Sequence, residues 1–406
     1  MSERIDNILE KLLVFGLSLY VIGSVFWTGV MHAGLGIAFL AWVISKVKNL
    51  NFKVKSSPLN KYILFFLLAA VLSFINSVDL ARSVDHFRRY FIYPAVLFFM
   101  VIDLDVDTKL IKKWLGVIFI AMVISITYTF WQEFEGVRRP SAFNFVMEYV
   151  NLVMFTMIYT VIYSLWGEIK KRYRVLLALV SIMGLISLVF TRTRGAWLAV
   201  IFSFACLFYI VNKKYIVYFL IGLTLFFALA PIFVPQDYVD RFVSIFDLEE
   251  DSSNITRVEL WEYSVELYKN NPIIGVGLHN FRNAHEVIDD LEKPAGNHRH
   301  AHNNFLQFAA TTGTIGLIAF VLLFAMMIKE MYRYYKASKN RNLKLFFLAN
   351  LTIIVGYLFN GLTNYNIDQR SAGRMLWFLV AISIVLAKRE NLIKDSAMTE
   401  KEALKK

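Results

Sequence analysis

Three of the seven histidines in this 406-residue chain occupy alternate positions, at His298, His300 and His302 of the stretch NHRHAHNNFLQ, directly before a hydrophobic segment. A neutral imidazole can accept a proton, as a general base must. His302 falls at the predicted start of a helix, where the helix dipole disfavours the imidazolium ion and keeps the ring neutral near pH 7. Asn303 and Gln307, four residues apart, are placed to orient a bound hydroxyl group or the ring itself. The stretch makes His302 a candidate general base and Asn303 a candidate substrate ligand.

The same histidines permit two other interpretations. If the stretch is extended, the three rings share one face, as the ligands of a metal ion must. The acidic residues that would add oxygen ligands are Glu286, Asp289 and Asp290. The chain contains no zinc signature of fixed spacing such as HExxH, so metal binding ranks behind proton transfer, and no metal or other cofactor is expected. A purely polar helix entrance is the third interpretation, and it suits His298 and His300 better than His302.

Arginines at the ends of hydrophobic segments form a second set of candidates. Arg192 and Arg194 lie in TRTRGAW, a stretch too short to be more than a tight turn between two such segments. Two charges at membrane depth are costly unless they have a function or a partner. Because an arginine fork binds phosphate or carboxylate with two hydrogen bonds, we favour binding of an anionic substrate. The alternative is a structural salt bridge to a carboxylate such as Asp237 or Glu262.

Arg257 belongs to a well-formed helix signature outside the hydrophobic segments, TRVELWEYSVELYKNNP. Thr256 and Glu259 match a capping box, which places Arg257 at the first helical position, where an anion can meet its guanidinium and free backbone N–H groups. The proline and glycine that follow end the helix. The residues predicted to form its apolar face are Val258, Trp261, Val265 and Tyr268. Trp261 is assigned to packing rather than to contact with a ligand.

The segments around these residues are those of a membrane protein. The chain is 57% hydrophobic, 16% aromatic and only 18% charged, which excludes an ordinary soluble protein. Apolar stretches of about twenty residues recur along nearly its whole length, each long enough to cross a bilayer as a helix. We predict an all-α polytopic membrane protein with about twelve transmembrane helices, at roughly 12–30, 31–46, 61–77, 89–102, 114–132, 145–166, 175–191, 195–212, 215–233, 303–328, 344–361 and 374–388. The first is taken as a retained span rather than a cleaved signal peptide, and the single cysteine, Cys206, excludes an intrachain disulfide.

Positive charges indicate the orientation. With the N-terminus in the cytoplasm, the predicted inside segments hold 28 Lys and Arg and the outside segments 15, as the positive-inside rule requires. The same rule explains much of the formal net charge of +12, so no nucleic-acid partner is expected. The outside segments hold 13 Arg but only 2 Lys, which favours an anionic substrate there over simple anchoring by arginine. Arg139, next to Arg138, is a weaker candidate ligand, and interface anchoring is a sufficient role for Arg88 and Arg89.

The predicted organisation has four parts. Residues 1–233 form nine transmembrane helices, and residues 234–301 form a loop domain on the outside of the membrane with the amphipathic helix. Residues 302–390 form three more transmembrane helices, and residues 391–406 form a cytoplasmic tail.

Three stretches together resemble the O-antigen ligase and polymerase superfamily, namely TRTRGAW, TRVELWEYSVELYKNNPIIGVGLHNF and HAHNNFLQFAATTGTIGL. The family pattern is an Arg-Gly turn, an arginine with a downstream tryptophan, a Pro–Gly-x-Gly–Asn-Phe stretch, and His-Asn-x-x-Leu followed by Gly-x-x-Gly-Leu. All four occur in order, most clearly between residues 191 and 318. The resemblance implies a glycosyltransferase of the bacterial inner membrane, active on the periplasmic side in lipopolysaccharide biosynthesis. Its donor would be a glycan on undecaprenyl pyrophosphate and its acceptor a sugar hydroxyl of the lipid A–core.

By motif, Arg194 and Arg257 match the family arginines associated with the pyrophosphate, and His302 matches the histidine associated with acceptor activation. The resemblance therefore implies a single, inverting displacement without a metal ion. An O-antigen polymerase and a protein O-oligosaccharyl ligase are alternatives within the superfamily. A lipid or sugar transporter is an alternative of a different class, but it predicts charges near mid-membrane and broken helices, whereas the predicted span interiors are almost free of charge.

Overall fold

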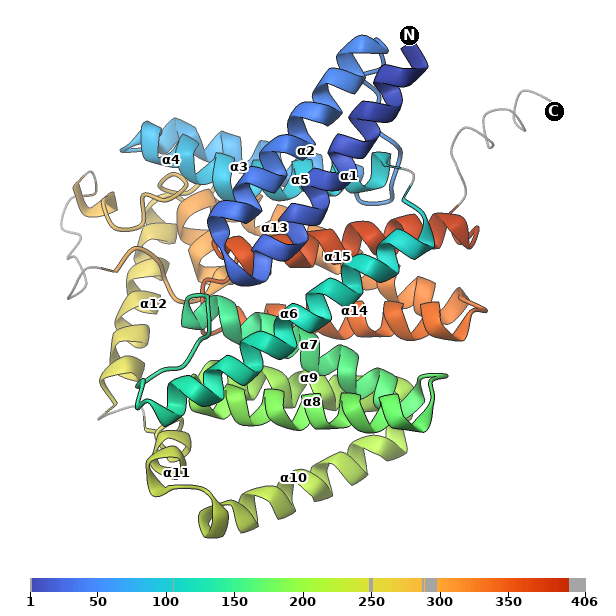
Figure 1. Cartoon of the computed structure of the whole chain (residues 1–406). Helices are drawn as coiled ribbons and strands as arrows, with labels where there is room; N and C mark the ends of the chain where they lie inside the picture. The colour runs from blue at the N-terminus through green and yellow to red at the C-terminus, as the bar shows by residue number, and fades with distance from the viewer. Residues whose placement is uncertain (1, 105, 248–250, 287, 289–297, 394–406) are drawn as a thin grey trace.

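The computed structural model describes residues 2–104, 106–247, 251–286, 288 and 298–393, and the regular elements within them are all helices (Figure 1). Ten of the described helices are long and apolar enough to cross a membrane. They are α1 (Ser2–Phe26), α2 (Thr28–Lys48), α6 (Thr108–Phe134), α7 (Val146–Trp166), α8 (Lys171–Phe190), α9 (Arg194–Val211), α10 (Lys213–Phe233), α13 (Asn304–Ala337), α14 (Arg341–Asn360) and α15 (Arg370–Arg389). The predicted class, an all-α polytopic membrane protein, is confirmed.

The two remaining predicted spans are shorter helices. α3 (Asn60–Leu72) continues as the 3-10 turn η1 (Ser73–Asn76), and together they are shorter than the other ten. α5 (Tyr93–Asp103) follows α4 (Leu80–Phe87) and a π-helical turn, η2 (Arg88–Ile92), without a break. The predicted total of about twelve therefore corresponds, among the described residues, to ten long helices, the shorter apolar helix Asn60–Asn76 and α5.

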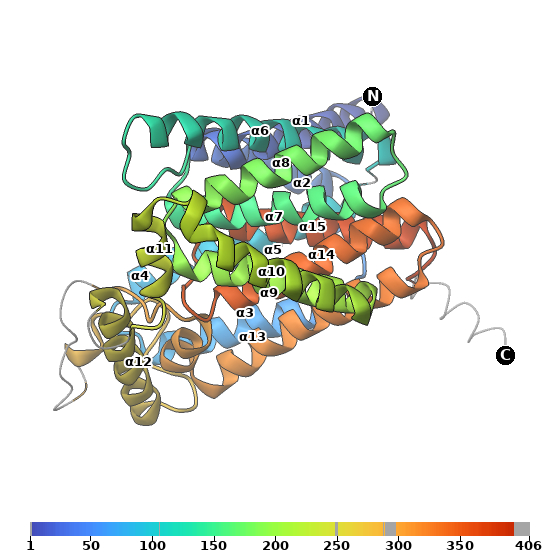
Figure 2. The ribbon, with the colours of Figure 1, turned by 90° about the horizontal axis from the view of Figure 1, so that it is seen from below.

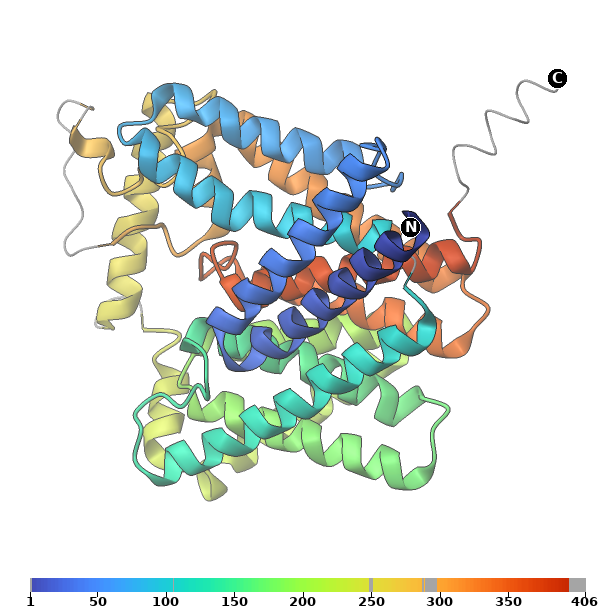
Figure 3. The same ribbon diagram turned by 45° about the horizontal axis from the view of Figure 1, so that its top comes forward.

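α15 lies at the centre of the bundle. Almost all of its side chains are buried, and it packs against α5, α7 and α14. α1 and α2 form a hairpin that lies across this core, and Figure 3 shows the hairpin in dark blue in front of the red α15. α10 differs, because none of its described side chains is fully buried. It packs against α9 and α11 (Gln236–Val243), forms the outer edge of the bundle in Figure 1 and crosses α9 in Figure 2.

The helix ends gather in two groups. At one end lie α11, α12 (Ser252–Asn270) and η3 (Ala284–Glu286), and α12 stands across the ends of the bundle (Figure 1). We call this the α12 end. At the opposite end, the connections that were predicted to lie inside contact one another. Examples are the pairs Lys46–Asp103, Tyr163–Asn342 and Ser338–Glu390. That the α12 end faces the periplasm stays a prediction.

α12 begins one turn earlier than the sequence predicts. Asp251 caps the helix by accepting hydrogen bonds from the backbone N–H groups of Ser253 and Asn254. The predicted capping box of Thr256 and Glu259 is therefore wrong, because the carboxylate upstream already occupies the cap position.

The buried face of α12 also differs from the prediction. Leu260, Tyr263 and Leu267 form it, whereas Val258 and Val265 are 40% and 39% exposed. Both sets of residues have helical spacing, so periodicity alone does not separate them. The tertiary structure selects the first set, because Phe281 and Ala310 supply the apolar surface onto which α12 packs.

α13 is interrupted at Gly313, whose φ of 63° and ψ of −166° are not helical. Residues 272–277 lie against the interruption and hydrogen-bond to its freed backbone groups. The pairs are Val276 N–Ala310 O, Gly277 N–Thr311 O, Thr314 N–Pro272 O and Ile315 N–Ile273 O, at 3.0, 3.1, 2.8 and 3.2 Å. The backbones approach so closely that a Cβ atom on Gly275 would lie 2.4 Å from the carbonyl carbon of Thr311. These motif glycines therefore fix the end of α12 against α13.

Candidate active site

Arginines gather around the carboxylate of Asp251 at the α12 end. Arg194, the first residue of α9, is only 5% exposed, and its Nη2 lies 2.7 Å from Asp251 Oδ1. Arg241 of α11 lies 3.4 Å from the other oxygen of the same carboxylate. Arg139 and Arg257 lie within electrostatic range of this group. We call Arg139, Arg194, Arg241 and Arg257 the arginine cluster. Two of the four guanidinium groups pair with Asp251 and the other two have no carboxylate partner among the described residues, so the excess positive charge favours binding of an anion.

Arg257 and Trp261 present donors that nothing in the described structure accepts. Arg257 Nη1 lies 3.3 Å from Asn254 Oδ1, but Arg257 Nε and Trp261 Nε1 are buried without a hydrogen-bond partner among the described residues. The two residues are one turn apart on α12. Burial, followed by the charge of Arg194, lowers the pKa of Arg257. Buried donors of this kind require an acceptor, and a bound substrate can supply it.

Arg257 does not lie at the first helical position, because α12 begins at Ser252. Two backbone N–H groups at the start of the helix donate to Asp251. The prediction that Arg257 and these N–H groups meet the same anion is therefore wrong. Arg257 contributes to the site through its guanidinium alone.

Arg192 forms a bidentate salt bridge with Glu133 at the end of α6. Its Nη1 and Nη2 lie 3.2 and 3.1 Å from the two carboxylate oxygens. Its guanidinium also stacks 4.5 Å from the ring of Tyr238, whose hydroxyl donates to the same carboxylate. A salt bridge was the alternative weighed for this residue, but Glu133 is the partner in place of the suggested Asp237 or Glu262. The long sequence separation concealed this pair.

Arg139 also binds the turn that carries Arg192 and Arg194. Its Nε donates to Thr191 O at 3.1 Å, and its Nη2 donates to Thr193 Oγ1 at 2.9 Å. Burial lowers the pKa of Arg139, and Arg241 and Arg138 lower it further. The connection after α6 and the turn before α9 are therefore held together by arginine side chains.

His302 lies just before α13, which begins at Asn304. Its φ of 49° is in the left-handed region, which is uncommon for residues other than glycine. Burial lowers the pKa of His302 to about 4, and the charges of Arg257 and His298 lower it further. The ring is therefore neutral near pH 7, as a general base requires. Burial is the main cause, ahead of the helix dipole on which the sequence argument relied.

The amides next to His302 position the backbone. Asn303 Oδ1 accepts from the N–H groups of Phe305 and Leu306 at 2.8 and 3.1 Å, and its Nδ2 donates to Leu362 O at 3.0 Å. Gln307 Oε1 accepts from the N–H of Ala301 at 2.8 Å. Asn303 is thus the N-cap of α13, and any direct contact between Asn303 and a substrate stays a prediction.

The fold adds two distant histidines that the sequence did not single out. The rings of His86 and His279 stack with centroids 4.5 Å apart, and His86 Nε2 lies 3.4 Å from the hydroxyl of Tyr365. His300 lies 5.7 Å from the Tyr365 ring and 4.3 Å from the His302 ring, measured between centroids. His279 belongs to the motif stretch that ends in Asn-Phe, but nothing in the sequence connects His86 with it.

Within the described residues, no group of three or more His, Cys, Asp and Glu side chains is arranged to hold a metal ion. Asp289 and Asp290, two of the acidic residues suggested as ligands, lie outside the described residues. Whether the chemistry needs a metal ion stays a question for experiment.

Residues 179–321 match the O-antigen ligase family. A protein of Haemophilus influenzae named "Uncharacterized protein" is 23% identical over 407 residues, which cover 93% of this chain and 99% of that protein. A Rickettsia conorii protein named "Putative polysaccharide ligase" is 30% identical over 173 residues, which cover 41% of this chain and 39% of that protein. A Rickettsia felis protein of the same name is 29% identical over 173 residues, which again cover 41% of this chain and 39% of that protein. These matches confirm the resemblance to the O-antigen ligase superfamily.

Proposed function

We propose that this protein is an inverting glycosyltransferase of the bacterial inner membrane. It transfers O-antigen glycan from undecaprenyl pyrophosphate to a sugar hydroxyl of the lipid A–core on the periplasmic side. The observation that carries the proposal is that His302, whose imidazole is neutral near pH 7, lies within electrostatic range of Arg257, whose buried Nε has no partner among the described residues. An acceptor hydroxyl needs the first group and a pyrophosphate needs the second.

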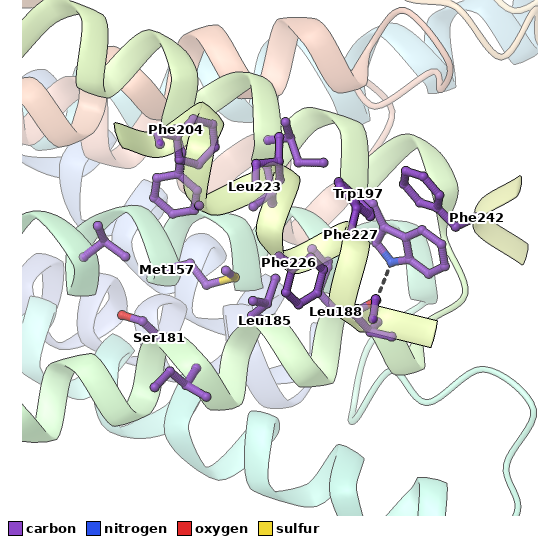
Figure 4. Close-up of a pocket in the computed structure, with 18 of the residues that line it drawn as sticks. Met157, Ser181, Leu185, Leu188, Trp197, Phe204, Leu223, Phe226, Phe227 and Phe242 are labelled. Carbon is purple, nitrogen blue, oxygen red and sulfur yellow. Dashed lines mark hydrogen bonds between the residues drawn. The ribbon is translucent and has the colours of Figure 1, made fainter. Parts of the chain in front are cut away.

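An apolar cavity of about 1040 Å³ between α8, α9 and α10 fits the isoprenoid tail of such a donor (Figure 4). At one end of the cavity, the rings of Trp197 and Phe242 lie 6.4 Å apart. Trp197 follows Arg194 by less than one turn of α9, and Phe242 directly follows Arg241. A tail in this cavity would therefore place its pyrophosphate at the arginine cluster.

The mechanism is a single displacement. His302 removes the proton from the acceptor hydroxyl as its oxygen forms a bond to the anomeric carbon. The bond from that carbon to the pyrophosphate oxygen breaks, and undecaprenyl pyrophosphate leaves with the electron pair. Arg194, Arg241 and Arg257 stabilise its negative charge, so that a divalent ion is not required. Attack opposite the leaving group inverts the anomeric centre.

The arginines of the turn have a second role in this proposal. Arg194 holds Asp251, which caps α12 and so positions Arg257. Arg139 and Arg192 add positive charge, but their guanidinium groups are already engaged by the turn and by Glu133. Direct contacts of Arg139 and Arg192 with the substrate stay predictions.

A reconstituted transfer reaction tests the function. Purified protein in vesicles, given undecaprenyl-pyrophosphate-linked glycan and lipid A–core, should produce glycan-bearing core lipid. A second glycan on the carrier, or an acceptor peptide, replaces the core lipid in parallel reactions. Product only with these would identify the polymerase or the protein O-oligosaccharyl ligase. If every acceptor fails while labelled carrier lipid crosses the vesicle membrane, the transporter replaces the enzyme.

Cysteine labelling tests the side of the membrane. In a Cys206→Ala background, cysteine at Ser252, an exposed position at the α12 end, should react with an impermeant thiol reagent in spheroplasts. Cysteine at Lys339, exposed at the opposite end, should react only after the membrane is permeabilised. The reverse pattern would place the arginine cluster in the cytoplasm and rule out a periplasmic active site.

A further inference from the structure

A second arginine site lies away from the arginine cluster, inside α15. Arg374 is 1% exposed, and its Nη2 donates to the backbone oxygen of Arg89 at 3.2 Å. Its guanidinium lies 5.3 Å from the ring centre of Tyr93. The remaining atoms Nε and Nη1 are buried and have no hydrogen-bond partner among the described residues. A buried guanidinium with two unused donors is costly, so a ligand that accepts from it would be stabilising.

Other unpaired donors occur at residues close to Arg374 in the chain and at Tyr20, which is within its electrostatic range. Gln369 Nε2, Ser371 Oγ and the hydroxyl of Tyr20 are also buried without a partner among the described residues. Gln369 Oε1 is already used, because it accepts from Asn151 Nδ2 at 2.8 Å. Gln369 and Arg374 both line one small cavity, whose volume of about 10 Å³ has room for roughly one water-sized oxygen atom. Gln369 and Arg374, which both have unpaired donors, line the same small space, and such an arrangement selects a group that accepts hydrogen bonds.

The acidic residues nearby do not supply that acceptor. Glu148 uses its two oxygens to accept from the backbone N–H groups of Arg370 and Ser371, each at 3.1 Å. Burial, followed by the charge of Glu148, raises the pKa of Asp368 to about 7, so this loop carboxyl is partly protonated near neutral pH. Arg370 lies within electrostatic range of Arg374 and adds a second positive charge. Arg89 is paired with Asp85 at 2.7 Å.

Contacts connect this second site with the histidines. Tyr365, which lies beside His300, is within electrostatic range of Tyr90, and Tyr90 interacts with Arg370. Side-chain contacts lead from His302 through His300, Tyr365 and His86 to Tyr90. Tyr90 lines the small cavity together with Gln369 and Arg374. A substrate that placed its reacting hydroxyl at His302 could reach the second site with another part of the same molecule.

We propose that Arg374, Gln369 and Arg370 bind an anionic oxygen, of a phosphate or a carboxylate group, carried by the acceptor. The inference rests on the proposed function, because it assigns the donor pyrophosphate to the arginine cluster and a second anion to the acceptor. The acceptor is thereby held at two points, by its anionic group in α15 and by its hydroxyl at His302. An acceptor without that anionic group would bind more weakly.

Acceptor binding without donor tests the site. The dissociation constant of lipid A–core is measured on detergent-solubilised protein, for the intact lipid, the phosphatase-treated lipid and the carboxyl-reduced lipid. Arg374→Met should weaken binding of the intact lipid about 10- to 100-fold, the usual worth of a hydrogen bond to a charged group. One of the two treated lipids lacks the group that the site recognises. Arg374→Met should bind that lipid with the same affinity as the wild type. Arg82→Met, at an exposed residue of α4, is the matched control and should have no effect.

Gln369→Glu separates recognition from structure. The new carboxylate would pair with Arg374, so the melting temperature should rise while affinity for intact lipid falls. Inorganic phosphate at millimolar concentration should compete with the intact lipid in the wild type but not in Arg374→Met.

The inference fails if Arg374→Met and Gln369→Glu bind all three lipids like the wild type. It also fails if Arg374→Met weakens all three equally, or if phosphate competes equally with both proteins. Binding with these differences, but without glycan transfer, would leave the site standing and overturn the proposed function instead.

Discussion

The turn before α9 and the second turn of α12 both carry arginine at the α12 end, but their hydrogen bonding differs. In the turn, Arg192 has a bidentate carboxylate partner, and Arg194 is bound to Asp251 and Ser244. On α12, Arg257 Nε and Trp261 Nε1 are both buried without a hydrogen-bond partner among the described residues. A satisfied guanidinium holds structure, whereas an unsatisfied one is available to a ligand. We therefore assign recognition of the substrate mainly to Arg257 on α12. The arginines of the turn hold α12 in position.

The largest effect is expected at His302, which lies within electrostatic range of the incompletely hydrogen-bonded Arg257. His302→Ala should lower kcat by about 10²–10⁴-fold, the usual contribution of a general base. Donor binding should persist, because the arginines hold the pyrophosphate. His298→Ala and His300→Ala should be much milder, because neighbours two residues away cannot all reach one hydroxyl. Single-turnover transfer measures the rate, and retention of labelled donor measures binding.

His302→Gln distinguishes proton removal from hydrogen bonding. Glutamine can still hold the acceptor hydroxyl, but it cannot act as a base near neutral pH. Turnover close to that of the wild type would reduce His302 to a positioning residue and leave the chemistry to the arginines.

The pH profile should show where the imidazole titrates. Because the pKa of His302 is lowered to about 4, the ring is neutral above that pH and protonated below it. We expect kcat/KM to be flat between roughly pH 5 and 8 and to fall about tenfold per pH unit below 4. A fall that begins near pH 6.5, the ordinary value for histidine, would show that His302 is not buried in the working enzyme.

Matched lysine substitutions test the comparison directly. Arg257→Lys should lower kcat/KM for the donor by roughly 10- to 100-fold, because an ammonium group cannot reproduce a bidentate fork on phosphate. Arg192→Lys should change donor kinetics less than threefold or so and act mainly on stability, since a partly exposed ion pair contributes about 0.2–1 kcal/mol. Donor titrations and thermal unfolding measure the two effects. Equal kinetic losses at both positions would remove the distinction between the turn and α12.

Arg194→Lys falls between these two cases. It keeps a positive charge in the cluster but weakens the hold on Asp251, so we expect loss of activity together with a lower melting temperature. Loss of activity without any loss of stability would leave Arg194 its role at the pyrophosphate and remove its role in positioning α12.

The smallest expected effect is that of chelation. Because arginines offset the pyrophosphate charge in this mechanism, excess EDTA should leave the transfer rate unchanged. Activity that disappears with EDTA and returns with zinc would instead assign the segment around His298, His300 and His302 to metal binding.

The sequence predicted much of the fold because membrane spans are coded locally. A run of apolar residues long enough to cross the bilayer must form a helix, since its backbone groups find no other partners in lipid. Prediction from local sequence was least accurate for α3 and α5, which are shorter than a full span. It also failed for the buried face of α12, where two sets of residues both have helical spacing. Ala310 lies far along the chain from α12 but packs against it in space, as does Phe281, and only such contacts decide which stripe is buried.

Residue type and spacing also determined the candidates for chemistry. The histidines before α13, the arginines at helix ends and the motif glycines are all visible in the sequence. Partners were not visible, because they lie far away along the chain. Glu133 pairs with Arg192 across 59 positions, and His86 meets Tyr365 across 279. Only the folded chain shows which guanidinium groups, at Arg257 and Arg374, are left with unused donors, because hydrogen bonding depends on distances that sequence spacing does not fix.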